Sequence, residues 1–284
     1  MNDPLLSCSA TQAPERSVDV SASVLRVRDG RVLAPQPDSL AEETPVALEY
    51  NGISHATMLA SPADLEDFAV GFSLTEGIID SIADVRDIEL RNEPQGVVVE
   101  LEIASACFAR LKDRRRAMSG RTGCGLCGVE TLPEVVRPLR RVPEGPPLSL
   151  ATILSIQDAM RRSQSLHDRT GATHAAAWAD AQGQLFAVRE DVGRHNALDK
   201  LVGAMMRAGQ DPRGGIVMVS SRASFEMVQK TTWMGAAVLA AVSAPTALAT
   251  RLADEAGLVL IGFVRGQGCT LYTHADRLRT GGNP

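Results

Sequence analysis

The chain has 284 residues, of which 44% are apolar and 22% charged, values typical of a globular protein. Its net charge of −5 argues against general binding to nucleic acid or acidic membranes, but it is compatible with a local basic pocket. The five cysteines are too few and odd in number for a disulfide framework. Residues 1–16 lack the pattern of a signal peptide, and the longest apolar stretch, 236–249, is too short to span a bilayer. We therefore expect a cytoplasmic protein with reduced thiols.

The N-terminal part is predicted to be a disordered tail followed by a small α+β domain. Residues 1–17 are polar and form the tail, and residues 18–118 form the domain. Residues 18–32 have strand character, and Ser61-Pro62 is typical of a helix start because a serine cap precedes proline at the first position. We expect a further strand at 97–103 and a short helix at 107–118.

Residues 119–148 predict a mobile loop between two domains. The segment is rich in glycine, proline and arginine and has no sustained apolar period. Long loops inside compact proteins are usually functional or disordered. The segment contains Cys124 and Cys127, a pair set among glycines.

Residues 149–284 predict a domain in which strands and helices alternate. Helices are expected at about 150–167, after Asn196, at 224–233 and after Pro245, and strands at 175–178, 185–189, 215–219, 237–242, 258–264 and 270–273. Such alternation favours a mostly parallel sheet that is covered on both faces.

Three chemistries are open to the cysteine pair: metal binding, dithiol redox and sulfur transfer. A structural zinc site usually takes four ligands in two pairs, and this chain has one CxxC and no close histidine pair, so no structural metal is predicted. Thioredoxin-like redox chemistry places the pair at a helix start, whereas Gly128 and Pro133 disfavour a helix here. Sulfur transfer needs an accessible thiolate, which nearby positive charge at Arg114, Arg115, Arg116 and Arg121 favours. Taken alone, the first three arginines are better explained as a solvated helix end.

Polar segments follow several of the predicted C-terminal strands. Residues 190–200, 220–224 and 243–246 each stand between a strand and a helix, and such turns hold ligands in parallel sheets. Helix capping explains 190–200 equally well, with Asn196 as a cap, Asp199 as its partner and His195 as an ordinary loop residue, and taken alone it is the better explanation of 220–224. Because these turns are expected to share one sheet edge, their combination favours a phosphate-binding site that includes Arg222. Residues 263–268 leave the last buried strand, where Arg265 and the glycines suit a phosphate.

The combination of motifs resembles the FdhD family of sulfurtransferases, or sulfur carriers, which formate dehydrogenase activity requires. The resemblance covers the chain from about residue 40 and rests on residues 119–128, 190–200, 221–228 and 243–246, with support from 61–79. Two small departures occur at Gly171-Ala172 and Ser220-Ser221, away from the cysteines.

The resemblance implies a function, a site and a fold. A cysteine desulfurase donates persulfide sulfur, and the chain delivers it to the molybdenum cofactor in its bis-guanine-dinucleotide form for formate dehydrogenase. The persulfide-bearing cysteine falls on Cys124, with Cys127 as its partner, and the cofactor-binding residues fall on Phe263, Val264, Arg265, Gly266, Gln267 and Gly268. The implied fold is a cytidine-deaminase-like three-layer α/β/α domain at 149–284 beside the smaller N-terminal α+β domain, assembled as a homodimer.

Two alternative functions compete with sulfur transfer. A zinc-dependent nucleobase deaminase needs H-x-E and P-C-x-x-C, but none of the histidines is followed two residues later by glutamate, and Gly123 precedes Cys124. A non-catalytic chaperone of the molybdenum cofactor would use the cysteines only to guard its ligand. The sequence leaves open the roles of Cys127, His195, Arg222 and the turn 243–246, and the surface to which the donor docks.

Overall fold

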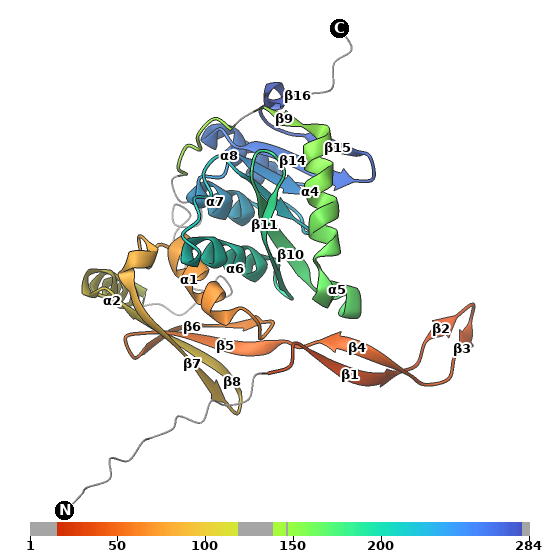
Figure 1. The fold of residues 1–284 in the computed structure, drawn as a ribbon. Helices are drawn as coiled ribbons and strands as arrows, with labels where there is room; N and C mark the ends of the chain where they lie inside the picture. Colours follow the sequence, from red (N-terminus) through yellow and green to blue (C-terminus); the bar gives the residue numbers. More distant parts are fainter. Residues whose placement is uncertain (1–15, 119–138, 146, 280–284) are drawn as a thin grey trace, which may run out of the picture.

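The computed structural model describes residues 16–118, 139–145 and 147–279 (Figure 1). Its N-terminal part contains a four-stranded sheet in the order β6-β5-β8-β7. The strands are β5 (Thr44–Tyr50), β6 (Ile53–Ala60), β7 (Val85–Glu93) and β8 (Gly96–Ile103). β5 and β8 pair in parallel, and the outer pairs are antiparallel. Alternate residues of β5 and β8 are buried, so one face of this sheet packs against the core and the other faces outward.

The helix α1 (Leu65–Thr75) begins later than the capping signal predicted. Asp64, in a left-handed conformation, precedes it and makes no side-chain cap. Ser61 is instead fully buried and bonds across to the C-terminal part, where its N–H donates to Asp191 at 3.0 Å and its Oγ accepts the N–H of Val192 at 3.1 Å. The expected cap at Ser61 is therefore wrong, because tertiary contacts claim its polar groups.

The expected helix at 107–118 is present as α2 (Ser105–Met118), and the short 3-10 helix η1 (Ile82–Asp84) lies before β7. Residues 119–138 follow, so the predicted loop at 119–148 lies mostly outside the described residues. The short strands β9 (Leu148–Ser149) and β16 (Leu278–Arg279) pair in parallel where the C-terminal part begins and ends.

The C-terminal sheet has six strands in the order β11-β10-β12-β13-β14-β15. They are β10 (His174–Ala179), β11 (Leu185–Asp191), β12 (Ile216–Val219), β13 (Val238–Ala241), β14 (Val259–Arg265) and β15 (Gly268–Leu271). β12–β13 and β13–β14 pair in parallel, while β10 is antiparallel to both neighbours and β15 is antiparallel to β14. The mostly parallel sheet that we predicted is therefore wrong in detail, because the β10–β11 hairpin inserts β10 in the opposite direction.

Helices cover both faces of this sheet and make the three-layer α/β/α arrangement that we expected (Figure 1). On one face lie α6 (Arg194–Arg207), α7 (Phe225–Met234) and α8 (Ala247–Ala256), and on the other lies α4 (Leu150–Arg162), followed by α5 (Ser165–Thr170). Along β12, Val217 and Val219 belong to one hydrophobic cluster, and Ile216 and Met218 belong to the other. This alternation matches a strand buried on both faces.

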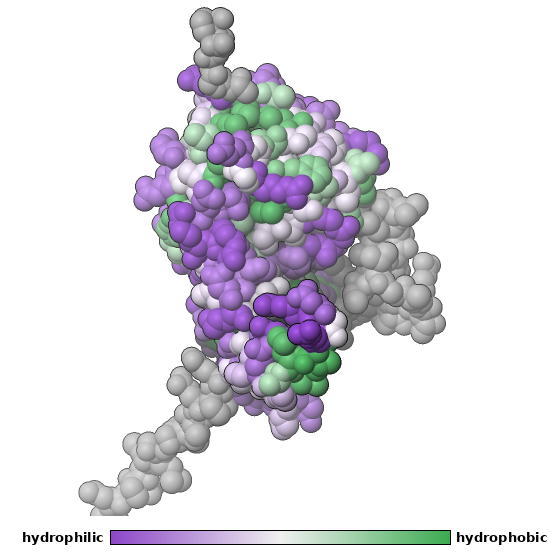
Figure 2. Space-filling model, turned by 90° about the vertical axis from the view of Figure 1, so that its right-hand side faces the viewer, coloured by the Kyte–Doolittle hydropathy of each residue, from purple (hydrophilic) through white to green (hydrophobic). Residues whose placement is uncertain are grey.

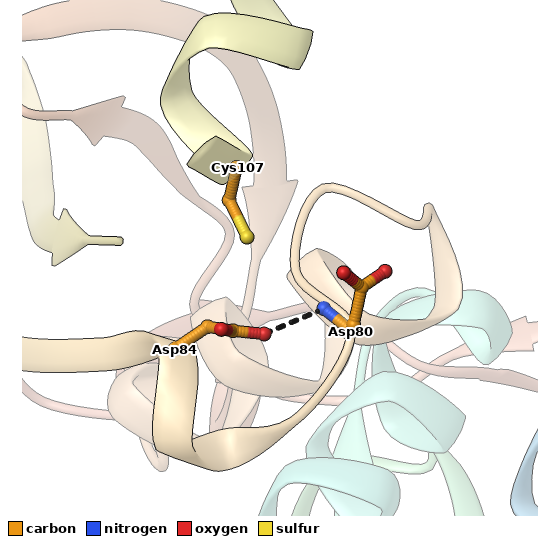
Figure 3. A group of neighbouring side chains, drawn as sticks. All are labelled: Asp80, Asp84 and Cys107. Atoms are coloured by element: carbon orange, nitrogen blue, oxygen red, sulfur yellow. Dashed lines mark hydrogen bonds between the residues drawn. The ribbon is translucent and has the colours of Figure 1, made fainter. Parts of the chain in front are cut away.

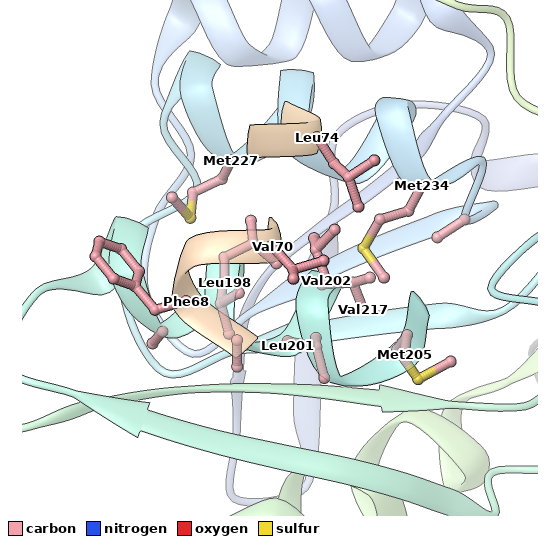
Figure 4. Packing of buried hydrophobic residues seen from close by; sticks show 14 of the residues in the cluster. Phe68, Val70, Leu74, Leu198, Leu201, Val202, Met205, Val217, Met227 and Met234 are labelled. Atoms are coloured by element: carbon pink, nitrogen blue, oxygen red, sulfur yellow. The ribbon is translucent and has the colours of Figure 1, made fainter. Parts of the chain in front are cut away.

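The helices α1 and α6 join the N-terminal part to the C-terminal layers. A Cβ atom on Gly71 would lie 1.8 Å from the backbone oxygen of Asp199, and one on Gly203 would lie 1.9 Å from that of Asp67. Two glycines thus let the helix backbones touch. Around this contact, Phe68, Val70 and Leu74 of α1 pack with Leu198, Leu201, Val202 and Met205 of α6 and with Met227 and Met234 of α7 (Figure 4). The domain division near 119–148 stays a prediction, and the core itself runs across it.

A two-stranded arm projects from the body at the N-terminal end (Figure 1). Antiparallel strands β1 (Asp19–Val24) and β4 (Gln36–Ala41) form its stem, and β2 (Val27–Arg28) and β3 (Arg31–Val32) form its tip. Asp29 and Gly30 both have positive φ between β2 and β3, as an Asp-Gly hairpin turn requires. Arg169 of α5 donates to Asp19 at 2.8 Å and anchors the base of the arm. Among the described residues, no helix has the length and apolar character needed to cross a bilayer.

Candidate functional site

Four polar segments come together at one edge of the C-terminal sheet. β11 runs in the same direction as β12, β13 and β14, because β10 lies antiparallel between β11 and β12. The segments that follow these strands, at 190–196, 220–224, 243–246 and 263–268, therefore lie at the same edge, which we call the polar edge. The predicted convergence of the three strand–helix turns is confirmed, and the fourth segment joins them.

Hydrogen bonds fix the middle of the polar edge. The N–H of Ala223 donates to Ala244 O at 3.3 Å, and the N–H of Thr246 donates to Ala223 O at 3.1 Å. Thr246 also caps α8, because its Oγ accepts the N–H of Ala249 at 3.3 Å. These bonds hold the turns after β12 and β13 side by side.

The segment at 263–268 forms the end of β14 and the turn into β15. Phe263 has φ +52°, which is unusual for a bulky residue, and its N–H donates to Ser243 O at 3.2 Å. The register with β15 shifts between Gly262 and Arg265, so a bulge accompanies this conformation. Arg265, Gly266 and Gln267 are exposed, and the Arg265 guanidinium lies 5.5 Å from the centre of the Phe263 ring. Unusual backbone held in place by its surroundings is typical of ligand-binding segments.

The starts of α6 and α7 meet through His195 and Glu226. Nε2 of His195 lies 3.0 Å from Oε2 of Glu226, close enough for an ion pair although outside the angles of a regular hydrogen bond. Contact with His195 lowers the pKa of Glu226, against the opposing effect of burial. Neither Gly193 before α6 nor Ser224 before α7 gives its helix a side-chain cap, so amides of both first turns face the polar edge without one.

Positive charge gathers at this edge. Arg194 begins α6 and has a buried Nε without a hydrogen-bond partner among the described residues, while Arg222 is exposed in the turn after β12. The pKa of His174, at the start of β10, is lowered first by burial and then by the charges of Arg194 and His167. Together with Arg265 and the starts of α6, α7 and α8, these groups suit an anion that carries several phosphates.

A buried charge network supports the polar edge from inside. Lys200 lies 2.7 Å from Asp191, and neither side chain has exposed surface. Asp191 also accepts the N–H of Gly193 at 2.7 Å and Nδ2 of Asn196 at 3.0 Å, so Asn196 is not the helix cap that we considered. Asp199 is likewise no cap partner, since it accepts Nζ of Lys230 at 2.8 Å and Oγ1 of Thr75 at 2.7 Å.

Sequence reasoning missed this network. The signal was available on α6, where Lys200 stands on the same helical face as Ala197, Leu201 and Ala204, among apolar residues. A charged residue in such a position is buried and needs a partner. The partner Asp191 was noticed only as a polar residue of the turn.

A smaller group lies in the N-terminal part, where Asp80, Asp84 and Cys107 place ligand atoms within 4.8 Å of one another (Figure 3). Asp84 accepts the N–H groups of Asp80 at 2.9 Å and Ser81 at 3.0 Å, and these bonds lower its pKa. Arg110 donates to Asp80 at 2.8 Å and lies 3.4 Å from Sγ of Cys107. A guanidinium therefore already balances the carboxylates, and the group fits a cap of η1. The absence of a structural metal stays a prediction.

Comparison with known proteins identifies the family. The model of the FdhD/NarQ family matches residues 41–279. This chain belongs to the FdhD/NarQ family. It is 65% identical over 268 residues to the sulfur carrier protein FdhD of Bordetella petrii, covering 94% of this chain and 96% of that protein. It is 53% identical over 279 residues to the protein of the same name from Cupriavidus necator, covering 98% and 96%.

A solved structure has the same fold as this FdhD/NarQ chain. The crystal structure of a putative formate dehydrogenase accessory protein from Desulfotalea psychrophila superposes with a TM-score of 0.71 at 23% identity. The match covers 93% of this chain and all of that one. The α/β fold class predicted from the resemblance is confirmed.

The cysteine pair of this FdhD/NarQ chain, Cys124 and Cys127, lies outside the described residues. The described chain resumes at the far end of α7 and α8 from the polar edge. There the Arg140 guanidinium lies 5.9 Å from the centre of the Trp233 ring, and the N–H of Val142 donates to Ala256 O at 3.0 Å. Trp233 and Ala256 are in the last turns of α7 and α8.

Proposed function

We propose that this chain is a sulfur carrier that takes persulfide sulfur from a cysteine desulfurase onto Cys124. It passes that sulfur to the molybdenum cofactor that serves formate dehydrogenase. Membership of the FdhD/NarQ family carries the proposal, together with relatives at 53–65% identity that are named sulfur carrier proteins. The structural neighbour from Desulfotalea psychrophila is described as a putative formate dehydrogenase accessory protein, which supports the same recipient.

The polar edge suits the proposed cargo, which is the bis-guanine-dinucleotide form of the cofactor. Such a molecule carries several phosphates, and the exposed arginines and helix starts of this edge attract them. We expect Arg265 and the backbone of 266–268 to contact one dinucleotide, since Arg265, Gly266 and Gln267 are exposed and the bulge at Phe263 and Val264 shapes the turn. The acidic total charge does not oppose this binding, because a local field is enough.

The proposed transfer starts with the Cys124 thiolate. It attacks the outer sulfur of the donor persulfide, a new sulfur–sulfur bond forms on Cys124, and the donor cysteine leaves as a thiolate. In the second step the Cys127 thiolate attacks Sγ of Cys124 and forms a disulfide, and the outer sulfur leaves at the oxidation level of sulfide for the cofactor. The two cysteines supply the two electrons, and a cellular dithiol regenerates them.

Mass spectrometry after incubation with a cysteine desulfurase and cysteine tests the first step. We expect the mass of one sulfur atom on Cys124, removable by thiol, and its loss in Cys124→Ala. The matched control is Cys269→Ala, because Cys269 is a free, partly buried thiol whose pKa burial raises. A wild-type chain that gains no sulfur on Cys124 refutes the carrier mechanism. If Cys124→Ala still supports formate dehydrogenase in cells that lack the native protein, the chaperone alternative is correct.

Binding of guanosine diphosphate tests the polar edge separately. Calorimetry on the full chain is expected to show binding that Arg265→Ala weakens about tenfold, the loss of one charge-assisted bidentate contact. Arg213→Ala is the control, since Arg213 is exposed and pairs with Asp211 outside the polar edge. Equal affinity of the two variants contradicts the placement of the phosphates at Arg265.

A further inference from the structure

The arm formed by β1–β4 carries most of the exposed large apolar side chains of the molecule. Ten such side chains stand exposed in the part of the chain that the structure describes, and six of them belong to the arm: Val20, Leu25, Val27, Val32, Leu33 and Leu40. Val27 and Val32 at the tip are 67% and 64% exposed. Figure 2, in which the arm points toward the viewer, shows apolar side chains gathered beside hydrophilic ones on the projecting part. Patches of this kind mark interaction surfaces.

The arm leaves apolar cross-strand pairs exposed to solvent. Val20 faces Leu40 across the stem, and Val27 faces Val32 across the tip, so apolar pairs stand in water on a ribbon of two strands. The opposite face of the stem is the one held to the body, through Asp19, Ser39 and Arg169. Isolated two-stranded ribbons are marginal in water, and a partner that covers the apolar pairs stabilises them.

The charges of the tip indicate what covers it. Arg28 stands directly opposite Arg31 in the β2–β3 register, and both are exposed. Like charges in directly opposite positions destabilise a strand pair. The turn between them holds one acid, Asp29, so the tip keeps a net positive charge. The tip is therefore built to meet an acidic surface.

The outer face of the N-terminal sheet carries the complementary arrangement. Asp87 stands opposite Glu102, and Glu89 stands opposite Glu100, in the β7–β8 register. With Asn51, these four acids line a hollow of about 390 Å³. Arg91 pairs with Glu100 at 2.7 Å and with Glu49 at 3.0 Å, and Arg86 lies 3.9 Å from Glu102, so the hollow keeps a surplus of negative charge. The chain thus carries one basic strand pair at the tip and two acidic strand pairs in the hollow.

The tip and the hollow do not meet within one molecule, since β2–β3 and β7–β8 lie toward opposite ends of the N-terminal part (Figure 1). We propose that two copies of this chain form a two-fold dimer in which the tip of each arm docks in the acidic hollow of the other. Two-fold symmetry makes both contacts at once and closes the assembly. The ion pairs between the arginines of the tip and the acids of the hollow select the partner. This identifies a surface for the homodimer implied by the family resemblance, and it does not depend on sulfur transfer.

Reciprocal charge reversal on the full chain tests this dimer. We expect sedimentation of the wild type to give a dimer, and Arg28→Glu/Arg31→Glu and Glu89→Lys/Glu102→Lys each to weaken dimerisation at least tenfold. An equimolar mixture of the two variants restores the dimer, because both contacts then pair opposite charges. The matched control is Arg161→Glu/Arg213→Glu, which reverses two exposed arginines outside the arm and leaves the dimer intact.

Three results overturn the proposal: a monomeric wild type, a tip variant that dimerises like the wild type, or a mixture that stays monomeric. Circular dichroism verifies that each variant folds. Sulfur loading of Cys124, measured on the monomeric variants, keeps the two proposals apart. Monomeric variants that still gain sulfur on Cys124 show that sulfur transfer does not need the dimer. A wild type that dimerises but gains no sulfur on Cys124 refutes only the proposed sulfur transfer.

Discussion

Replacing Lys200 with methionine tests whether the buried network holds α1 against the C-terminal layers. The Lys200 ammonium donates to Ser61 O at 2.9 Å and pairs with Asp191 at 2.7 Å, with no exposed surface on either side chain. Methionine keeps most of the volume but leaves Asp191 as a buried carboxylate without a cation. Breaking such a pair from one side costs about 3–5 kcal/mol. Asp191 retains three N–H donors, so we expect the lower end, a loss of about 3 kcal/mol in the free energy of unfolding.

Urea unfolding, followed by tryptophan fluorescence and circular dichroism, measures this loss. The control is Lys112→Met, which removes an ammonium 4.7 Å from the Phe108 ring on α2, with an expected change of at most about 1 kcal/mol. In a double-mutant cycle, Asp191→Asn combined with Lys200→Met costs less than the sum of the single changes by more than about 1 kcal/mol. A Lys200→Met chain within about 0.5 kcal/mol of the wild type, or strictly additive costs, refutes the reasoning.

Three further predictions concern the helix contact and the polar edge. Gly203→Ala forces α1 and α6 apart, because its Cβ would lie 1.9 Å from Asp67 O; unfolding should become easier by about 2–3 kcal/mol, while Gly268→Ala, in open space, changes little. Burial and the charge of Arg194 lower the pKa of His174, so this imidazole binds a proton more readily in the unfolded chain than in the folded one. The melting temperature should therefore fall as the pH drops below the ordinary pKa of 6.5, and His174→Gln should make the melting temperature depend less on pH. Equal pH dependence in the variant and the wild type argues against a buried neutral imidazole. Contact with His195 lowers the pKa of Glu226, so nuclear magnetic resonance titration should show it rising toward 4.5 in His195→Ala; an unchanged Glu226 titration would mean that the two side chains do not interact.

Patterns local to a segment predicted their elements well. The strands at 97–103 and 185–189 follow from residue patterns that act over a few positions. Ser61 shows where such reasoning fails, because its capping signal is local but its polar groups bond to residues about 130 positions away. The direction of β10 was also out of reach, since strand order is decided by contacts between distant segments.

The polar edge was predictable from the direction of the strands, whereas the charge network that supports it depends on how the helices pack. Strand ends in the same direction share an edge, so polar turns at 190–196, 220–224 and 243–246 had to meet once the sheet formed. Asp191, Asp199 and Lys230 look like surface charges in the sequence, whereas Lys200 stands on an apolar helical face. Which partner each of them meets depends on the packing of α1 onto α6. The positive φ of Phe263 was not predictable either, because it depends on the hydrogen bond to Ser243 and on the bulge opposite β15.

The close backbone contact between α1 and α6 has a consequence for how the chain acquires its structure in the cell. Gly71 and Gly203 are separated by about 130 residues, and ribosomes add about 5–20 residues per second, so α6 emerges on the order of ten seconds after α1. Until then Phe68, Val70 and Leu74 have no partner helix to cover them. The apolar face of α1 therefore stays exposed to solvent on the ribosome until α6 has been synthesised. We expect the nascent chain to be most dependent on chaperones in this interval, and to complete its core only after synthesis has passed α7.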